Sequence, residues 1–174
     1  MPRMFRASMR CPQLPHGSAK VLALVALMTI LCSCEKSAHE QLEDARSSLA
    51  SASYDKAVTA AEAGLQASPS KMDAWGLELI KLESYARGGN GESAKQHLLK
   101  LASLYPKQLS PTDYSSTAQQ LQAADQGPSA IEVLDLGKKR YPADELIDRM
   151  IAESVSAQSS PEELDMLRSL GYIE

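Results

Sequence analysis

Residues 114–142 read YSSTAQQLQAADQGPSAIEVLDLGKKRYP, and this stretch decides the fold. Its first half places Tyr114, Ala118 and Leu121 at the spacing of one helix face. Residues 125–128 (DQGP) then supply strong turn-forming residue types, and apolar residues at helical spacing resume after them. Two amphipathic segments separated by so short a break predict two antiparallel helices packed as a hairpin.

The same pattern extends over the rest of the chain. From residue 38 onward, apolar residues recur at helical spacing and the alternation typical of strands is absent. Hydroxyl residues followed by proline, as at Ser110-Pro111 and Ser160-Pro161, mark helix starts. The sequence therefore predicts an all-α fold with helices over residues 37–50, 55–67, 71–87, 92–104, 111–124, 129–140, 143–156 and 161–169.

The hairpins repeat along the sequence. Pro69, Pro106 and Pro142 each close a segment, at intervals of 37 and 36 residues. A small residue stands early in the second helix of the last two segments, Ala94 in one and Ala130 in the other. Because small residues at a fixed place let two helices approach closely, this spacing predicts stacked copies of one hairpin.

The best copy is carried by six residues: Tyr114, Ala118, Leu121, Ala130, Leu134 and Pro142. This copy resembles the tetratricopeptide repeat, which has a small residue early in its second helix and a proline at its end. A weaker first copy is marked by Ala45, Tyr54, Ala57 and Pro69. The resemblance spans residues 38–142, and an unrelated all-helical bundle is the alternative.

The resemblance implies a short solenoid of about three hairpins followed by capping helices at the C-terminal end. Such a solenoid has a concave face lined by the first helix of each hairpin, and this face binds peptides or partner segments. The last helix is expected to fold back and seal the last hairpin. A protruding tail that docks on a partner is the alternative.

The groove-facing side chains implied by the resemblance come from three helices. They are Leu42, Arg46 and Leu49 in the first, Leu79, Glu83 and Arg87 in the second, and Ser115, Gln119 and Gln122 in the third. We expect the partner-binding groove to be formed chiefly by Arg46, Leu79, Glu83, Arg87, Gln119 and Gln122. The alternative for each of these residues is an ordinary solvated helix face.

The N-terminal segment has the pattern of an export signal. The first 20 residues are basic and contain no acidic residue, and an eleven-residue apolar run follows. Residues 31–34 (LCSC) resemble the bacterial lipoprotein signal, which implies lipidation of Cys34. A conventional signal cut near Cys34 is the alternative. The expected organisation is a signal peptide over 1–33, a lipidated tether over 34–37, a repeat domain with cap helix over 38–157, and a C-terminal helix and tail over 158–174.

Composition argues against several classes of function. A cut before Cys34 would remove four of the 18 basic residues and none of the 22 acidic ones, leaving a net charge of about −8. Such an acidic chain is a poor partner for nucleic acid. His39 and His97 lack metal-ligand spacing, and no free thiol would remain. We therefore expect no catalytic residue, no metal site, no cofactor and no small-molecule substrate.

These patterns together predict a scaffold lipoprotein of the bacterial cell envelope. It would bind protein or peptide partners through the groove and attach to the membrane through its lipid. Glu35 follows the anchor in place of the Asp linked to inner-membrane retention, which favours the outer membrane, facing the periplasm. An accessory role in outer-membrane, pilus or secretion assembly is the leading hypothesis. The alternatives are an anchoring or regulatory subunit of an envelope enzyme and a purely structural or surface lipoprotein.

Overall fold

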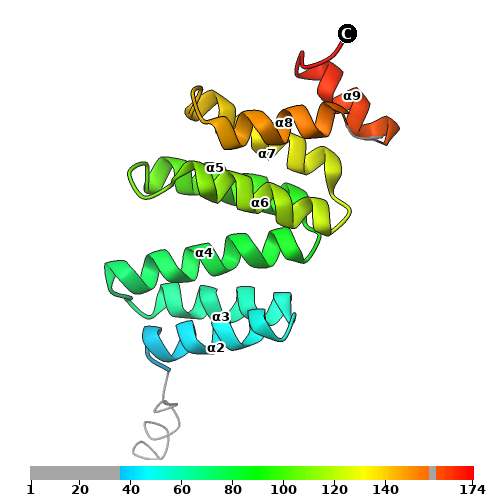
Figure 1. Ribbon diagram of the computed structural model, residues 1–174. Coiled ribbons are helices and arrows are strands. Elements are labelled where there is room, and N and C mark those ends of the chain that lie inside the picture. The colour runs from blue at the N-terminus through cyan, green and yellow to red at the C-terminus, as the bar shows by residue number, and fades with distance from the viewer. Residues whose placement is uncertain (1–35, 157–159) are drawn as a thin grey trace, which may run out of the picture. The chain divides into compact units, whose positions relative to one another are not determined.

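The structure, a computed structural model, describes residues 36–156 and 160–174. Within these residues there are eight helices and no strand. The helices are α2 (Ala38–Ala50), α3 (Tyr54–Gln66), α4 (Lys71–Arg87), α5 (Gly91–Leu104), α6 (Pro111–Ala123), α7 (Gly127–Arg140), α8 (Glu145–Ser156) and α9 (Pro161–Ser169) (Figure 1). The predicted signal peptide over 1–33 and the predicted lipidation of Cys34 lie outside the described residues.

Consecutive helices pack as hairpins, and the hairpins stack. α2 packs on α3, α4 on α5 and α6 on α7, while α2, α4, α6 and α8 contact one another in order. Figure 1 shows this succession from α2 and α3 at one end to α8 and α9 at the other. The fold is an all-α helical solenoid, which confirms the fold class predicted from the hairpin pattern. We call α2, α4 and α6 the first-helix row.

All eight helices begin and end within two residues of their predicted positions. α7 begins two residues earlier than predicted because Pro128 fits its first turn, where no backbone N–H is required. α8 begins two residues later than predicted. The reason is Asp144, whose carboxylate accepts hydrogen bonds from the backbone N–H groups of Leu146 and Ile147 at 3.1 and 3.0 Å.

Small residues hold the helices close together. Seven fully buried alanines lie in the contacts between helices: Ala45, Ala57, Ala61, Ala86, Ala94, Ala118 and Ala130. Gly137 of α7 lies where α6 and α8 approach it. A methyl group at Gly137 would lie 2.9 Å from Cδ1 of Ile147 and 3.0 Å from Cβ of Tyr114, so a larger residue has no room there. The small residues that suggested close hairpin packing therefore occupy such contacts.

The buried apolar side chains divide into two clusters, and α4 belongs to both. Leu77 is part of the first cluster, with residues of α2 and α3, and Leu82 is part of the second, with residues of α5 to α8. Two charged residues of α4, Glu78 and Lys81, are also buried. Lys81 Nζ donates a 2.8 Å hydrogen bond to Oε1 of Glu62 on α3. The face that α4 turns toward the second helices is therefore partly polar.

Aromatic pairs close two successive hairpins in the same way. Trp75 at the start of α4 lies against Tyr105 at the end of α5, with ring centroids 5.4 Å apart. Tyr114 at the start of α6 lies against Tyr141 at the end of α7, with centroids 5.8 Å apart. The α4–α5 and α6–α7 hairpins therefore share an aromatic contact between the start of the first helix and the end of the second.

The last helix folds back on the solenoid, as expected for a seal on the last hairpin. α9 packs on α7, and Leu167 is fully buried. After the helix, the Tyr172 hydroxyl donates a 3.1 Å hydrogen bond to Oδ1 of Asp135 on α7. Burial and the neighbouring Asp135 carboxylate raise the pKa of Tyr172 to about 12, so the hydroxyl keeps its proton at neutral pH.

Candidate partner-binding face

A groove runs along the first-helix row where α4 lies beside α6. Its first hollow, of about 140 Å³, is lined by Leu79, Leu82, Glu83, Asp113, Ser116, Thr117 and Gln120. Its second hollow, of about 340 Å³, is lined by Tyr54, Glu83, Arg87, Gln120, Ala123 and Ala124. Because Glu83 and Gln120 line both, the two hollows form one continuous surface. We call this surface the α4–α6 groove.

The charged side chains of the groove hold one another in place. Arg87 Nη1 donates a 3.0 Å hydrogen bond to Oε1 of Glu83, one helical turn before it. The guanidinium of Arg87 also lies over the ring of Tyr54, 5.6 Å from its centroid. The hydrogen bond to Glu83 raises the pKa of Arg87, so this side chain is a permanent cation. Both charges remain partly exposed and accessible to a partner.

Three of the six predicted groove residues line this groove. Leu79, Glu83 and Arg87 lie one turn apart on α4, and the structure places all three in the hollows. Gln119 and Gln122 on α6 are exposed but line neither hollow, and the glutamine that does is Gln120. The predicted face of α6 is thus displaced by about one residue, or roughly 100° around the helix.

Three further residues expected to face the groove are buried in the solenoid. Leu42 is 3% exposed, Leu49 is 9% exposed and Ser115 is 2% exposed. The Ser115 hydroxyl donates a 3.1 Å hydrogen bond to the carbonyl oxygen of Thr112. Leu42 and Leu49 belong to the first apolar cluster. The expectation that these side chains are available to a partner was wrong, because they pack against neighbouring helices.

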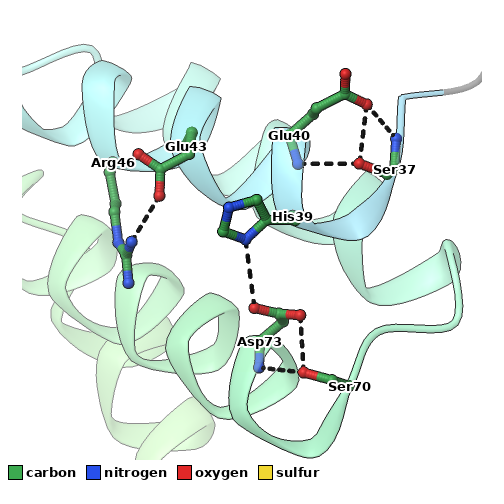
Figure 2. A network of polar contacts seen from close by, with 7 residues as sticks. All are labelled: Ser37, His39, Glu40, Glu43, Arg46, Ser70 and Asp73. Carbon is green, nitrogen blue, oxygen red and sulfur yellow. Dashed lines mark hydrogen bonds and ion pairs between the residues drawn. The ribbon is translucent and has the colours of Figure 1, made fainter. Parts of the chain in front are cut away.

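Arg46 lies at the other end of the first-helix row, in the polar network of Figure 2. Its Nη1 donates a 2.6 Å hydrogen bond to Oε1 of Glu43 on the same helix. A methyl group at Gly76 of α4 would lie 4.0 Å from Arg46 Nη2, so the guanidinium reaches across to α4. His39 of α2 points toward Asp73 of α4, with Nδ1 and Oδ1 3.7 Å apart (Figure 2). Arg46 therefore shares the row with the groove but does not line it.

Several groove residues have no counterpart in the sequence-based prediction. They are Tyr54 from α3, Leu82 from α4, and Asp113, Ser116, Thr117, Gln120, Ala123 and Ala124 from α6 and its end. Ser116, Gln120 and Ala123 recur at intervals of four and three residues, which is the spacing of one helix face. That spacing is visible in the sequence, but which face of α6 is covered depends on its packing partners.

The groove is equipped for hydrogen bonding. It presents two carboxylates (Glu83 and Asp113), a guanidinium, the Gln120 amide and hydroxyl groups beside the apolar Leu79. Within residues 36–156 and 160–174, no group of three His, Cys, Asp or Glu side chains is placed to hold a metal ion. Over the same residues, no helix combines the length and apolar character needed to span a membrane.

Comparison with protein-family models, with curated proteins and with solved structures finds no match to this chain.

Proposed function

We propose that this chain is a membrane-anchored, periplasmic-side scaffold lipoprotein that binds partner proteins through the α4–α6 groove. The observation that carries the proposal is the continuity of the groove, in which Glu83 and Gln120 each line both hollows. The groove lies on the row of helices that solenoids of this kind use to bind peptide segments. The tetratricopeptide-like pattern of residues 114–142 supports the same role.

The shape of the groove favours a protein segment as its occupant. Its first hollow, of about 140 Å³, is smaller than the roughly 300–1,000 Å³ typical of ligand pockets, and its second, of about 340 Å³, lies at the lower end of that range. An extended or helical segment can instead lie along α4 and α6 and use several shallow contacts at once. The Glu83–Arg87 pair and Gln120 would fix its register through hydrogen bonds. Leu79 would contribute an apolar contact.

Membrane attachment is proposed from the sequence of residues 1–35. The basic leader, the short apolar run and the LCSC segment together support lipidation of Cys34 after removal of the signal peptide. Several acyl chains on one residue anchor a protein stably, since each buried CH₂ contributes about 0.8 kcal/mol. We propose the outer membrane as the site of attachment, with the solenoid facing the periplasm.

The groove is tested by photo-crosslinking in the native cell envelope. A photo-reactive amino acid is placed at Gln120, which lines both hollows, or at its neighbour Gln119, which is exposed outside them. We expect Gln120 to crosslink to a defined envelope protein and Gln119 to do so much less. Equal crosslinking from the two positions would contradict binding through this groove. No crosslink from either would favour a structural or surface lipoprotein.

Anchoring is tested separately with Cys34→Ala. Mass spectrometry of the wild-type N-terminus should find a lipid-modified Cys34, and the wild-type chain should fractionate with membranes. Cys34→Ala should release it from that fraction. A wild-type N-terminus that begins at another residue without lipid would overturn the anchoring proposal and leave the groove proposal standing. An enzyme recovered from the Gln120 crosslink would assign the chain as its anchoring or regulatory subunit.

A further inference from the structure

A cavity of about 660 Å³ lies where the start of α3 meets the end of α4. Its lining includes Tyr54, Asp55, Lys56 and Val58 of α3 and Ser84 and Tyr85 of α4. It shares Tyr54 with the second hollow of the α4–α6 groove, and none of its other lining residues belongs to either hollow. Its volume falls within the range of small-molecule pockets. We call it the α3 cavity.

The N-terminus of α3 faces this cavity without a side-chain cap. The side chain of Ser53, at the N-cap position, makes no hydrogen bond to the first turn of α3. Gln126 at the start of α7 likewise provides no side-chain cap, whereas Ser37, Ser70 and Ser160 each accept a hydrogen bond from the first turn of their own helices. The first backbone N–H groups of a helix have no partner within the helix and carry the positive end of its dipole. The start of α3 therefore offers donors suited to a negatively charged group.

A buried hydroxyl group of α4, also in the lining of the cavity, lacks a partner. Ser84 of α4 is 1% exposed and lines the α3 cavity, and its Oγ has no hydrogen-bond partner. Hydroxyls inside helices commonly bond the carbonyl four residues earlier, as Thr59 and Thr117 do here. A buried hydroxyl group without a partner lowers the stability of the fold, and a ligand that accepts a hydrogen bond from it removes that cost.

The charges and carbon surfaces of the lining restrict the class of ligand. Lys56 adds a cation and Asp55 an anion, so these two side chains nearly cancel. Asp55 repels any anion in the cavity, but it repels a phosphate with close to two negative charges more strongly than a single carboxylate, whose charge Lys56 and the start of α3 can balance. Tyr54, Val58 and Tyr85 supply an apolar wall beside these donors.

We propose that the α3 cavity binds a monocarboxylate with an apolar or aromatic body. The carboxylate accepts hydrogen bonds from the first amides of α3 and from Ser84 Oγ, and the apolar body lies against Tyr54, Val58 and Tyr85. Such a carboxylate can belong to a free organic acid or to the end of a peptide chain. This inference does not rest on the partner-binding proposal, because it concerns a different site and a different class of ligand.

The test is a titration of the ¹⁵N-labelled full chain in detergent with 3-phenylpropionate, followed by NMR. The matched neutral probe is 3-phenylpropionamide, and an N-acetylated peptide ending in a free Phe carboxylate represents a chain end. We expect the acids to shift the amide resonances of Tyr54, Asp55 and Lys56 and the amide probe not to. Equal shifts from acid and amide, or no shift from either acid, would overturn the proposal. Shifts from the peptide acid alone would assign the carboxylate to a chain end.

Ser84→Ala isolates the role of the buried hydroxyl. Since the Oγ has no partner in the free protein, this variant should be at least as stable as wild type, yet bind the acid roughly ten-fold more weakly. Ser115→Ala is the matched control, because Ser115 is equally buried on α6 and does not line the cavity. It should bind the acid as wild type does. Unchanged affinity in Ser84→Ala would contradict the proposed contact.

Discussion

The Nε2 atom of His97 lies 3.1 Å from Oε2 of Glu78, and both side chains are almost completely buried. The same Nε2 lies 3.0 Å from the backbone carbonyl oxygen of Glu78. Because carbonyl and carboxylate oxygens only accept, this nitrogen carries the ring proton and donates it. Lys100 Nζ donates a 3.0 Å hydrogen bond to the other carboxylate oxygen. α4 and α5 are therefore joined by an ionic contact within the solenoid.

This contact predicts a specific loss of stability in acid. Burial alone would raise the pKa of Glu78, but hydrogen bonds and charge from His97 and Lys100 outweigh burial and lower it to about 2. A carboxyl group whose pKa is lower in the folded than in the unfolded state stabilises the fold above the unfolded pKa. That stability, about 3 kcal/mol, is lost as the pH falls from about 4 toward 2.

Urea unfolding measured at about pH 7 and about pH 3 checks this prediction. Glu78→Gln should lower the free energy of unfolding at neutral pH and lose less on acidification than wild type does. Glu153→Gln, an exposed carboxylate on α8, serves as the control and should follow the wild-type curve. If Glu78→Gln and wild type lose equal stability between the two pH values, the ionic contact does not contribute as described.

Tyr141→Phe should loosen the contact between successive hairpins. The Tyr141 hydroxyl donates a 2.5 Å hydrogen bond to the carbonyl oxygen of Leu109, in the loop between α5 and α6. Losing it should lower the free energy of unfolding by about 1 kcal/mol. Tyr105→Phe is the matched control, because Tyr105 closes the preceding hairpin through its ring contact with Trp75. Thermal unfolding should show a larger decrease for Tyr141→Phe than for Tyr105→Phe.

Gly137→Ala should destabilise the solenoid although alanine favours helices. A methyl group there would lie 3.0 Å from Cβ of Tyr114, an atom fixed to the backbone, and the overpacking cost of about 1–3 kcal/mol exceeds the gain in helix propensity of about 1 kcal/mol. Gly76→Ala is the comparison, since its nearest neighbour is the flexible end of Leu42 at 3.3 Å. Chemical unfolding should show a loss for Gly137→Ala and little change for Gly76→Ala. Equal effects at the two positions would contradict close packing at Gly137.

Gly127→Ala should displace α9 from the start of α7. A methyl group at Gly127 would lie 1.7 Å from Oε1 of Glu163, so the α9 carboxylate has to move. Hydrogen exchange of the α9 amides should accelerate in this variant while α4 to α6 stay protected. Adding Glu163→Ala removes the obstructing side chain, so the double variant should be less perturbed than the sum of the single changes. Strictly additive effects would show that the two residues do not interact.

Most of the fold was predictable from local sequence features. Prolines, hydroxyl caps and glycine-rich breaks fix the ends of helices through short-range chemistry, which is why every boundary fell within two residues. The two boundaries that differ by two residues, the starts of α7 and α8, also have local causes. Asp144 caps α8, and Pro128 belongs to the first turn of α7 instead of the preceding loop. The short connections between successive helices predicted that these helices pack as antiparallel hairpins.

The candidate sites were less predictable because they depend on which helices meet. On α4 the predicted groove residues Leu79 and Glu83 proved to line the hollows. On α6 it is Gln120 that lines the hollows, while the predicted Gln119 is exposed outside them, because packing against α4 and α7 decides which face of α6 borders the groove. The lack of a partner for Ser84 depends on three-dimensional placement, and no pattern in the sequence indicated it. The predictions for residues 1–35 remain tied to the sequence alone.

The membership of α4 in both apolar clusters bears on how the chain folds. The first cluster includes Leu77 and the second includes Leu82, so both contain residues of the same helix, α4. In stacked repeat proteins, cooperativity depends on the free energy of each interface between neighbours. With polar side chains such as Glu78 and Lys81 along α4, loss of α2 and α3 would leave the second cluster with its own apolar contacts. Loss of α4, by contrast, would remove residues from both apolar clusters at once.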